Sequence, residues 1–151
     1  PGLRSGLVAG DAALIQAFLL YRTYHGCAMP VPTQKASIAA WGDDAHVAAN
    51  RALYREKYDR VLPVLAPVVE ATRPAGGFYL WLPVGADDAA FTAGLFAQQH
   101  ITVVPGSYLA RASDGINPGA GHVRLSLVAT VEECVQAAHR LREFIESRTR
   151  S

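Results

Sequence analysis

Arg4 and Arg124 are the two residues of this sequence whose type and surroundings best suit the binding of an anion. Arg124 stands in the stretch HVRLSLVA, which alternates in polarity and follows a glycine-rich segment, and Arg4 stands between Gly2 and Gly6. A guanidinium keeps its proton in proteins, and its planar fork matches a carboxylate with two parallel hydrogen bonds. Glycines also let the backbone turn tightly and approach a bound anion. Both arginines are therefore candidate binding residues.

Spacing alone leaves a second interpretation open for each arginine. Arg124 could be a strand residue whose outward face meets solvent, and Arg4 could be a surface residue near a chain end. Whether each arginine binds a ligand or only meets solvent depends on the structural element that carries it.

The other reactive residue types point away from metal and nucleotide chemistry. Neither the five histidines nor the two cysteines show the spacing of a metal site, so we expect no metal. The sequence contains no G-x-S-x-G motif, P-loop or dinucleotide-binding glycine pattern. We expect Cys27 and Cys134 to be reduced thiols rather than a disulfide, as is usual in the cytosol.

Composition bounds the class of protein. The chain has 151 residues, of which 50% are hydrophobic and 18% charged, enough for one domain or for a small domain plus part of another. Its net charge of +1 comes from scattered basic and acidic residues and gives no electrostatic footprint for nucleic acid or an anionic membrane. No apolar run reaches the roughly 18–20 residues of a membrane span. We therefore expect a cytoplasmic protein that binds neither nucleic acid nor membrane.

The first third of the chain predicts a strand followed by helices. Residues 7–9 are apolar and flanked by glycines, which is typical of a buried strand. Asp11 is a good N-cap for a helix over about 12–24 that stops at Gly26, and this helix is apolar around much of its circumference. Pro30 and Pro32 predict a loop before a short helix over about 33–41. A longer helix then opens at Asp43 or Asp44 and carries a kink at Pro63.

The rest of the chain predicts an antiparallel sheet with covering helices. The stretch VVEATRPAGGFYLWLPV contains two β-prone runs around a Pro/Gly turn and predicts a hairpin, in which Tyr79 and Trp81 are more typical of core than of a site. Further expected elements are a helix from Asp87 or Asp88 to about His100, a strand at ITVV, a long loop over 105–122 and a strand at HVRLSLVA. Thr130 and Glu133 form a capping box for a final helix over about 131–147. This helix is expected to bury Val131, Val135, Ala138, Leu141 and Ile145.

The resulting order from about residue 69 onward is ββ-α-β-β-α, which indicates an α+β fold with helices on a mainly antiparallel sheet.

Four motifs taken together are more specific than any one of them. The stretches PGLRSGLVAGD, GGFYLWLPV, ITVVPGSYLA and GHVRLSLVA occur in one order, and with them essentially the whole chain resembles the C-terminal part of a class I/II aminotransferase. These are fold-type-I enzymes that use pyridoxal 5'-phosphate. The stretches FLLYRTYHGCAMPVPTQKASIAAW and NPGAGHVRLSLVA are most similar to succinyldiaminopimelate aminotransferases. The resemblance implies transamination of N-succinyl-L,L-diaminopimelate with 2-oxoglutarate in lysine biosynthesis, by a homodimer.

The resemblance also assigns residues. Arg124 matches the arginine that binds the substrate α-carboxylate, and Arg4 matches the one that binds the cofactor phosphate. The family's Schiff-base lysine would lie before Pro1, and neither Lys35 nor Lys57 matches its position. We therefore expect no catalytic residue in this chain and no activity from it alone.

Three further residues lie in segments of interest without an assigned role. The stretch TYHGCAMPVPTQ resembles a segment near the partner subunit's active site, where Tyr24 and His25 could contact substrate or phosphate. PGSYLA departs from the commoner family form, which ends in Phe-Gly, and leaves Tyr108 unassigned.

The same resemblance implies a domain organisation. Residues 1–43 would end the large cofactor-binding domain, 44–68 would form an interdomain helix, and 69–151 would form the C-terminal small domain. Two alternatives remain at this point: a stand-alone α+β regulatory module that uses Arg124 to bind a carboxylate ligand, and a purely structural dimerisation segment.

Overall fold

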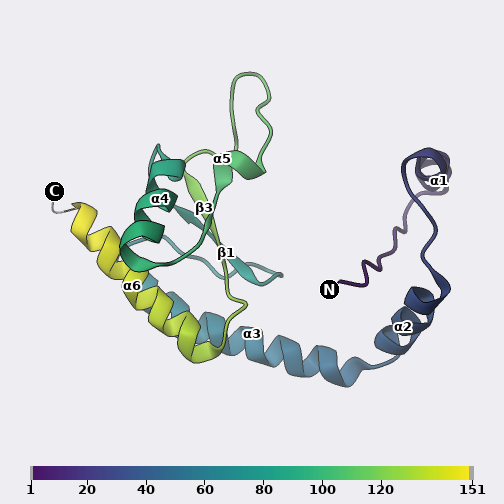
Figure 1. The fold of residues 1–151 in the computed structure, drawn as a ribbon, viewed down its shortest axis with the longest axis horizontal. Helices are drawn as coiled ribbons and strands as arrows, with labels where there is room; N and C mark the ends of the chain where they lie inside the picture. Colours follow the sequence, from purple (N-terminus) through teal and green to yellow (C-terminus); the bar gives the residue numbers. More distant parts are fainter. Residues whose placement is uncertain (1, 150–151) are drawn as a thin grey trace. The chain divides into compact units, whose positions relative to one another are not determined.

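The computed structural model describes residues 2–149, which separate into two compact units, one ending at Ala48 and the other beginning at Ala49 (Figure 1). The first unit holds α1 (Ala12–His25), α2 (Val31–Trp41) and the start of α3 (Asp44–Leu65). The second holds the rest of α3, three strands and three further helices. The predicted α+β fold is confirmed. No helix within residues 2–149 combines the length and the apolar character needed to cross a membrane.

Helix α1 follows its sequence signals. The Asp11 carboxylate accepts hydrogen bonds from the amides of Ala13 (2.9 Å) and Leu14 (3.2 Å), and the helix ends at Gly26. None of the residues of α1 is buried within the part of the chain that the structure describes. Several large apolar side chains on it are exposed: Leu14, Leu19, Leu20 and Tyr24.

Two expectations for the first unit are wrong. Residues 7–9 are not a buried strand, because none of the strands within residues 2–149 pairs with them, and Leu7 and Val8 are more than 60% exposed. Helix α2 begins at Val31 rather than Thr33. Pro30 is its N-cap and Pro32 lies in the first turn, where a missing N–H removes no helical hydrogen bond.

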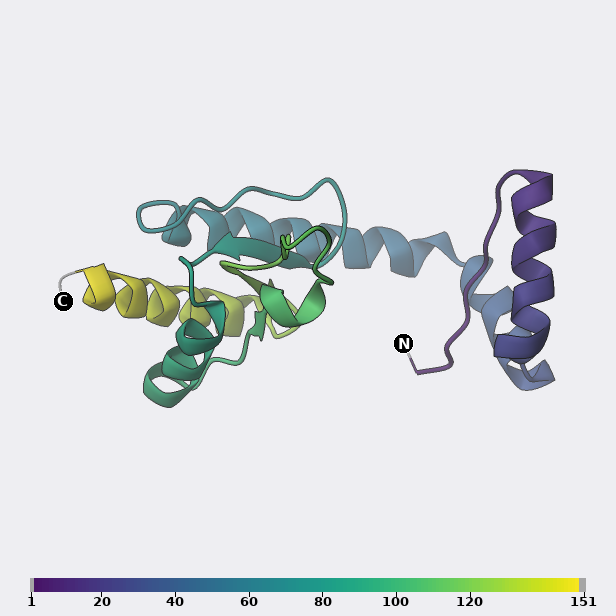
Figure 2. The same cartoon turned by 90° about the horizontal axis from the view of Figure 1, so that it is seen from above.

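The second unit is built on a three-stranded antiparallel sheet. Its strands are β1 (Tyr79–Pro83), β2 (Val104–Pro105) and β3 (His122–Ser126), in the order β1-β3-β2, so that β3 is central. The helices that follow α3 are α4 (Asp88–Gln99), α5 (Gly106–Leu109) and α6 (Val131–Thr149). In Figures 1 and 2, α6 runs alongside the C-terminal part of α3.

The predicted hairpin before β1 is wrong, and only its second run is a strand. The amides of Val68 and Val69 donate to the carbonyl of Leu65, so this segment continues α3 as a turn instead of pairing with β1. Pro67 and Pro74 also remove donors that a ladder would need. The element order of the second unit is therefore β-α-β-α-β-α after α3, with a one-turn helix inside the expected loop.

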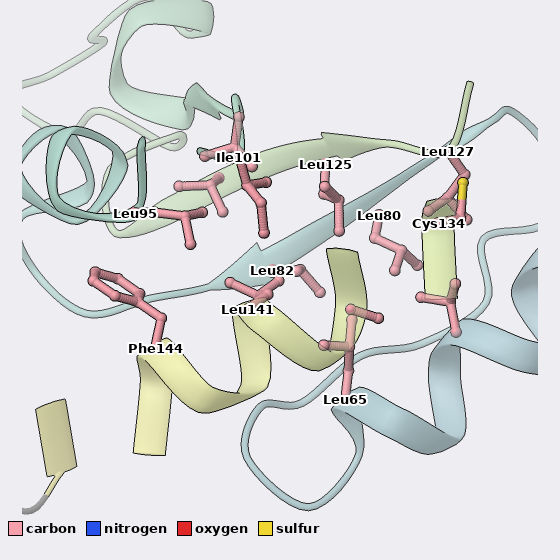
Figure 3. Close-up of a cluster of buried hydrophobic side chains, with 14 of the residues drawn as sticks. Leu65, Leu80, Leu82, Leu95, Ile101, Leu125, Leu127, Cys134, Leu141 and Phe144 are labelled. Carbon is pink, nitrogen blue, oxygen red and sulfur yellow. The ribbon is translucent and has the colours of Figure 1, made fainter. Parts of the chain in front are cut away.

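One face of the sheet carries the hydrophobic core. Side chains alternate along β1 and β3, so that Leu80, Leu82, Val123 and Leu125 are buried and their neighbours are not. Figure 3 shows Leu80, Leu82 and Leu125 gathered into one cluster with residues of α3, α4 and α6, and Val123 belongs to the same cluster. Phe144 of α6 packs edge-to-face on Phe91 of α4, with ring centroids 5.2 Å apart.

Helix α6 confirms its predicted cap and corrects its predicted buried face. The Thr130 amide donates to the Glu133 carboxylate (2.9 Å) and the Glu133 amide donates to the Thr130 hydroxyl (3.3 Å), the two bonds of a capping box. The buried residues are Val131, Cys134, Ala138, Leu141 and Phe144. Val135 and Ile145 are only partly buried, because the helix turns its largest ring, Phe144, towards Phe91.

We predict that Phe144→Ala lowers the free energy of unfolding by about 3–5 kcal/mol, because it removes buried ring surface and leaves a cavity. Phe144 is 1% exposed, whereas Phe96 on α4 is 57% exposed and provides a matched control. Phe96→Ala is expected to change stability by no more than about 0.5 kcal/mol. Urea unfolding of both variants checks this, and equal effects would contradict the position of the core.

Candidate functional site

Arg124 lies at the centre of the sheet face that does not carry the core. It pairs in register with Trp81 of β1 and with Val104 of β2, and it is partly buried. Its guanidinium carbon lies 5.8 Å from the centroid of the Tyr79 ring. The alternation predicted for HVRLSLVA is confirmed. Neighbouring strands flank the arginine on both sides, and β1 contributes the aromatic rings.

The Arg124 side chain has unused binding capacity. Its Nε is buried and has no hydrogen-bond partner within the described residues, and none of the ion pairs among residues 2–149 involves Arg124. A buried donor without an acceptor costs about 1–3 kcal/mol. An anionic acceptor from outside residues 2–149 would relieve this cost, and a carboxylate matches the geometry of the guanidinium.

Aromatic rings form a wall beside Arg124. The rings of Trp81 and His122 are stacked, with centroids 5.6 Å apart and planes 11° apart, and His122 Nδ1 lies 3.0 Å from the carbonyl oxygen of Ala120. A Cβ added to Gly106 would lie 2.7 Å from the indole of Trp81, so the ring needs a glycine beneath it.

The sequence interpretation of Tyr79 and Trp81 as core residues is wrong. Both are 40% exposed and share the face of Arg124. Their alternation with Leu80 and Leu82 was the signal that could have placed them there, because successive strand residues point to opposite faces.

Arg4 lies in an open hollow of the first unit. The hollow has a volume of about 540 Å³ and is lined by residues 2–6 together with Ala36, Ser37, Ala40 and Trp41. Arg4 has a φ of 56°, a left-handed conformation that is uncommon for arginine. The hydroxyl groups of Ser5 and Ser37 are 2.5 Å apart at the same hollow. The Ser37 hydroxyl also bonds to the Thr33 carbonyl at 2.8 Å, so Arg4 is the cationic residue that lines this hollow.

The two candidate arginines belong to different units, Arg4 to the first and Arg124 to the second, and each site is described within its own unit. Tyr24 is exposed near the end of α1, and the His25 ring stacks on Tyr21 with centroids 4.5 Å apart. Tyr108 is exposed on α5.

Lys57 is buried and engaged in a structural contact. Its Nζ donates to the carbonyl of Leu127 at 2.9 Å and lies 4.7 Å from the centroid of the Tyr54 ring. Leu127 directly follows the end of β3, so Lys57 anchors the strand that carries Arg124. Lys35, in contrast, is exposed on α2.

Both cysteines are free, as expected from the sequence. Cys27 is exposed in the first unit and Cys134 is buried in the second. Burial raises the pKa of the Cys134 thiol, an effect that the nearby charge of Lys57 only partly offsets. No group of three or more histidine, cysteine, aspartate or glutamate side chains within residues 2–149 could hold a metal ion.

Comparison with known proteins identifies the family. A family model described as "Aminotransferase class I and II" matches residues 1–141. An aminotransferase of Neisseria meningitidis, known from a crystal structure, is 53% identical, with a TM-score of 0.82 over 96% of this chain and 37% of that chain.

Two curated relatives carry more specific names. A 4-dedimethylamino-4-oxo-anhydrotetracycline transaminase of Streptomyces rimosus is 34% identical over 93% of this chain and 37% of its own length. An LL-diaminopimelate aminotransferase of Dehalococcoides mccartyi is 29% identical over 95% of this chain and 36% of its own length. This chain thus spans about a third of the length of the curated relatives it matches. Enzymes of this family depend on pyridoxal 5'-phosphate. The family match and the shared fold agree, and the chain belongs to the class I and II aminotransferases.

Proposed function

We propose that this chain is the C-terminal segment of a pyridoxal-phosphate-dependent aminotransferase, in which Arg124 binds the α-carboxylate of the amino-acid and 2-oxo-acid substrates. The observation that carries the proposal is the buried Nε of Arg124, which has no partner within residues 2–149. Family membership supplies the reaction class. The geometry supplies a cationic fork on a rigid central strand, flanked by Tyr79 and Trp81.

Arg124 acts in this proposal by orienting the substrate. Two parallel hydrogen bonds from a guanidinium hold a carboxylate in one plane and so set the direction of the bonds at the α-carbon. Partial burial of Arg124 reduces competition from water and strengthens these charge-assisted bonds. The same contact serves an amino acid and a 2-oxo acid, because both carry a carboxylate next to the reacting carbon.

Arg4 suits the cofactor's phosphate. Arg4 lines the hollow of the first unit together with Ser5, and a guanidinium offers several donors to a phosphate. When bound, pyridoxal phosphate supplies an electron sink for the negative charge that develops at the substrate α-carbon. This chain's part is to hold the phosphate through Arg4.

The proposal assigns no catalytic residue to this chain. Lys57 is buried against Leu127, and Lys35 lies exposed on a helix, so neither replaces the Schiff-base lysine of the family. That lysine is proposed to lie outside this segment, and the segment alone is proposed to be inactive. The domains are proposed as 1–43 for the end of the large domain, 44–68 for the interdomain helix and 69–151 for the small domain.

The substrate proposed is N-succinyl-L,L-diaminopimelate, with 2-oxoglutarate as amino acceptor, in a cytoplasmic homodimer of lysine biosynthesis. Support comes from the two sequence stretches that resemble succinyldiaminopimelate aminotransferases and from a relative named for the related LL-diaminopimelate. A relative named for another substrate matches 93% of this chain. The α-carboxylate contact is therefore proposed to be common to them, and the side-chain preference to come from other residues.

We predict that Arg124→Ala in the full-length enzyme lowers kcat/KM for the amino acid about 10²–10³-fold, because one partner of a charge-assisted pair is lost. Arg124→Lys keeps the charge but loses the fork, so an intermediate effect is expected. Arg140→Ala is the control, since Arg140 is exposed on α6, which covers the opposite face of the sheet. Steady-state kinetics of the three variants measure this. If Arg124→Ala had the same kcat/KM as Arg140→Ala, binding of the substrate carboxylate by Arg124 would be refuted. Carboxylate binding without any turnover by the full-length protein would favour a regulatory module instead.

We predict that Arg4→Ala weakens the binding of pyridoxal phosphate about 10–100-fold, the loss expected for hydrogen bonds to a charged group. Absorbance titration of the full-length apoenzyme with the cofactor measures this. At saturating cofactor, the KM for the amino acid is expected to stay unchanged. The control is Arg22→Ala on α1, which should bind the cofactor like the wild type. A cofactor affinity unaffected by Arg4→Ala would remove Arg4 from the phosphate site.

A further inference from the structure

The segment 106–121 connects β2 with β3, the strand that carries Arg124. The segment leaves β2, whose Val104 pairs with Arg124, and returns directly into β3. Figure 1 shows it projecting from the sheet beyond α5 before it comes back. How its two ends are held therefore affects the strand positions on either side of the arginine.

Asp88 holds the outgoing end of this segment. It is 4% exposed, and its carboxylate accepts hydrogen bonds from the Ser107 amide (2.7 Å) and the Ser107 hydroxyl (2.9 Å). Burial alone would raise the pKa of Asp88, but the bonds from Ser107, helped by the first amides of α4, outweigh it and lower the pKa. The carboxylate therefore stays charged at neutral pH. No cation pairs with Asp88 among the described ion pairs.

Capping of α4 does not explain Asp88. The N-cap of this helix is Asp87, whose carboxylate accepts a hydrogen bond from the Ala90 amide at 2.8 Å. Asp87 is exposed, whereas Asp88 turns its buried carboxylate to Ser107, which is 19 residues further along the chain. The start of α4 therefore does not explain why the buried Asp88 carboxylate bonds to a distant loop.

Asn117 ties the returning end to the outgoing end. Its side-chain amide donates to the Ser107 carbonyl at 3.0 Å, and its side-chain oxygen accepts from the Gly119 amide at 2.9 Å. The two backbones also touch, since a Cβ on Gly106 would lie 2.3 Å from the carbonyl oxygen of Gly119. Asp88, Ser107, Asn117 and Gly119 thus form one chain of hydrogen bonds across the base of the segment.

This base supports the wall beside the arginine. Gly106 lies directly beneath the indole of Trp81, and Trp81 is the register partner of Arg124 and stacks on His122. A shift of Gly106 would therefore change the position of the Trp81 ring, which lies on the same face of the sheet as Arg124.

We propose that Asp88 is a positioning residue for the Arg124 site: by holding Ser107, and through it Asn117, it keeps the base of segment 106–121 closed and Trp81 in place opposite Arg124 in the sheet. The proposal rests on the proposed function, because the site so positioned is the one for the substrate carboxylate. Asp88 contacts neither substrate nor cofactor in this account.

The test compares Asp88→Asn with Asp87→Asn in the full-length enzyme. Asparagine keeps the size of Asp88 but removes its charge and one acceptor, whereas asparagine at Asp87 still caps α4. Asp88→Asn is expected to raise the KM for the amino acid about tenfold, with kcat changed less than about twofold, as for one lost bond to a charged group. Asp87→Asn should leave both constants unchanged. A Ser107→Ala variant, which loses only the hydroxyl bond, gives a smaller effect and serves if Asp88→Asn does not fold.

A double-mutant cycle separates positioning from a general structural role. In the Arg124→Ala background, Asp88→Asn is expected to cause no further rise in KM, because the group that it positions is gone. A further rise of the same size would overturn the proposal. So would a kcat that falls as much as KM rises in the single variant.

Hydrogen exchange gives a readout that does not depend on turnover. The amides of Ser107 and Gly119 should exchange faster in Asp88→Asn than in Asp87→Asn, and unchanged exchange would overturn the proposal. If Arg124→Ala leaves KM unchanged while exchange responds to Asp88→Asn, the proposed function fails. If Arg124→Ala raises KM and Asp88→Asn does not, the function stands and the positioning role fails.

Discussion

The central strand β3 contributes side chains both to the core and to the candidate site. The rest of the second unit is arranged around this strand. Val123 and Leu125 are buried on one face, and Arg124 projects from the other. Because strand side chains alternate, packing of the core decides which way the arginine points. A slip of one residue in register would bury the guanidinium among leucines and expose the core side chains. The apolar cluster in Figure 3 is therefore also what orients the binding group.

Local signals were enough to predict several elements from the sequence. The carboxylate of Asp11 and the hydroxyl of Thr130 satisfy amides within three residues of themselves, so the starts of α1 and α6 can be recognised without tertiary information. Strands were harder, because an apolar run becomes a strand only when another strand pairs with it. Val68 and Val69 have β-prone side chains, but their amides donate to the carbonyl of Leu65 and continue α3 as a turn.

The site around Arg124 was predictable in one part only. Arg124 could be found because an arginine interrupts an apolar alternation and a family motif surrounds it. Alternation with Leu80 and Leu82 could have placed Trp81 on the face opposite the core. Its pairing with Arg124 comes from cross-strand register, which residue spacing along one chain does not reveal. The contact between Asp88 and Ser107 was hidden for the same reason, since the sequence shows an acid at a helix start and nothing that singles it out from Asp87.

Two buried charged residues, Lys57 and Asp88, lie next to the strand that carries Arg124. Their hydrogen bonds explain why each can be buried without an opposite charge. Lys57 donates to the carbonyl of Leu127, just after β3, and Asp88 accepts from Ser107, just after β2. Hydrogen bonds with one charged partner are about twice as strong as neutral ones, and they do not neutralise the charge. In a buried ion pair, the two charged groups would instead bond to each other. Charges bonded to backbone groups instead tie α3 and α4 to the ends of the strands. The bonds that offset the desolvation cost of each charge therefore also hold the backbone around Arg124.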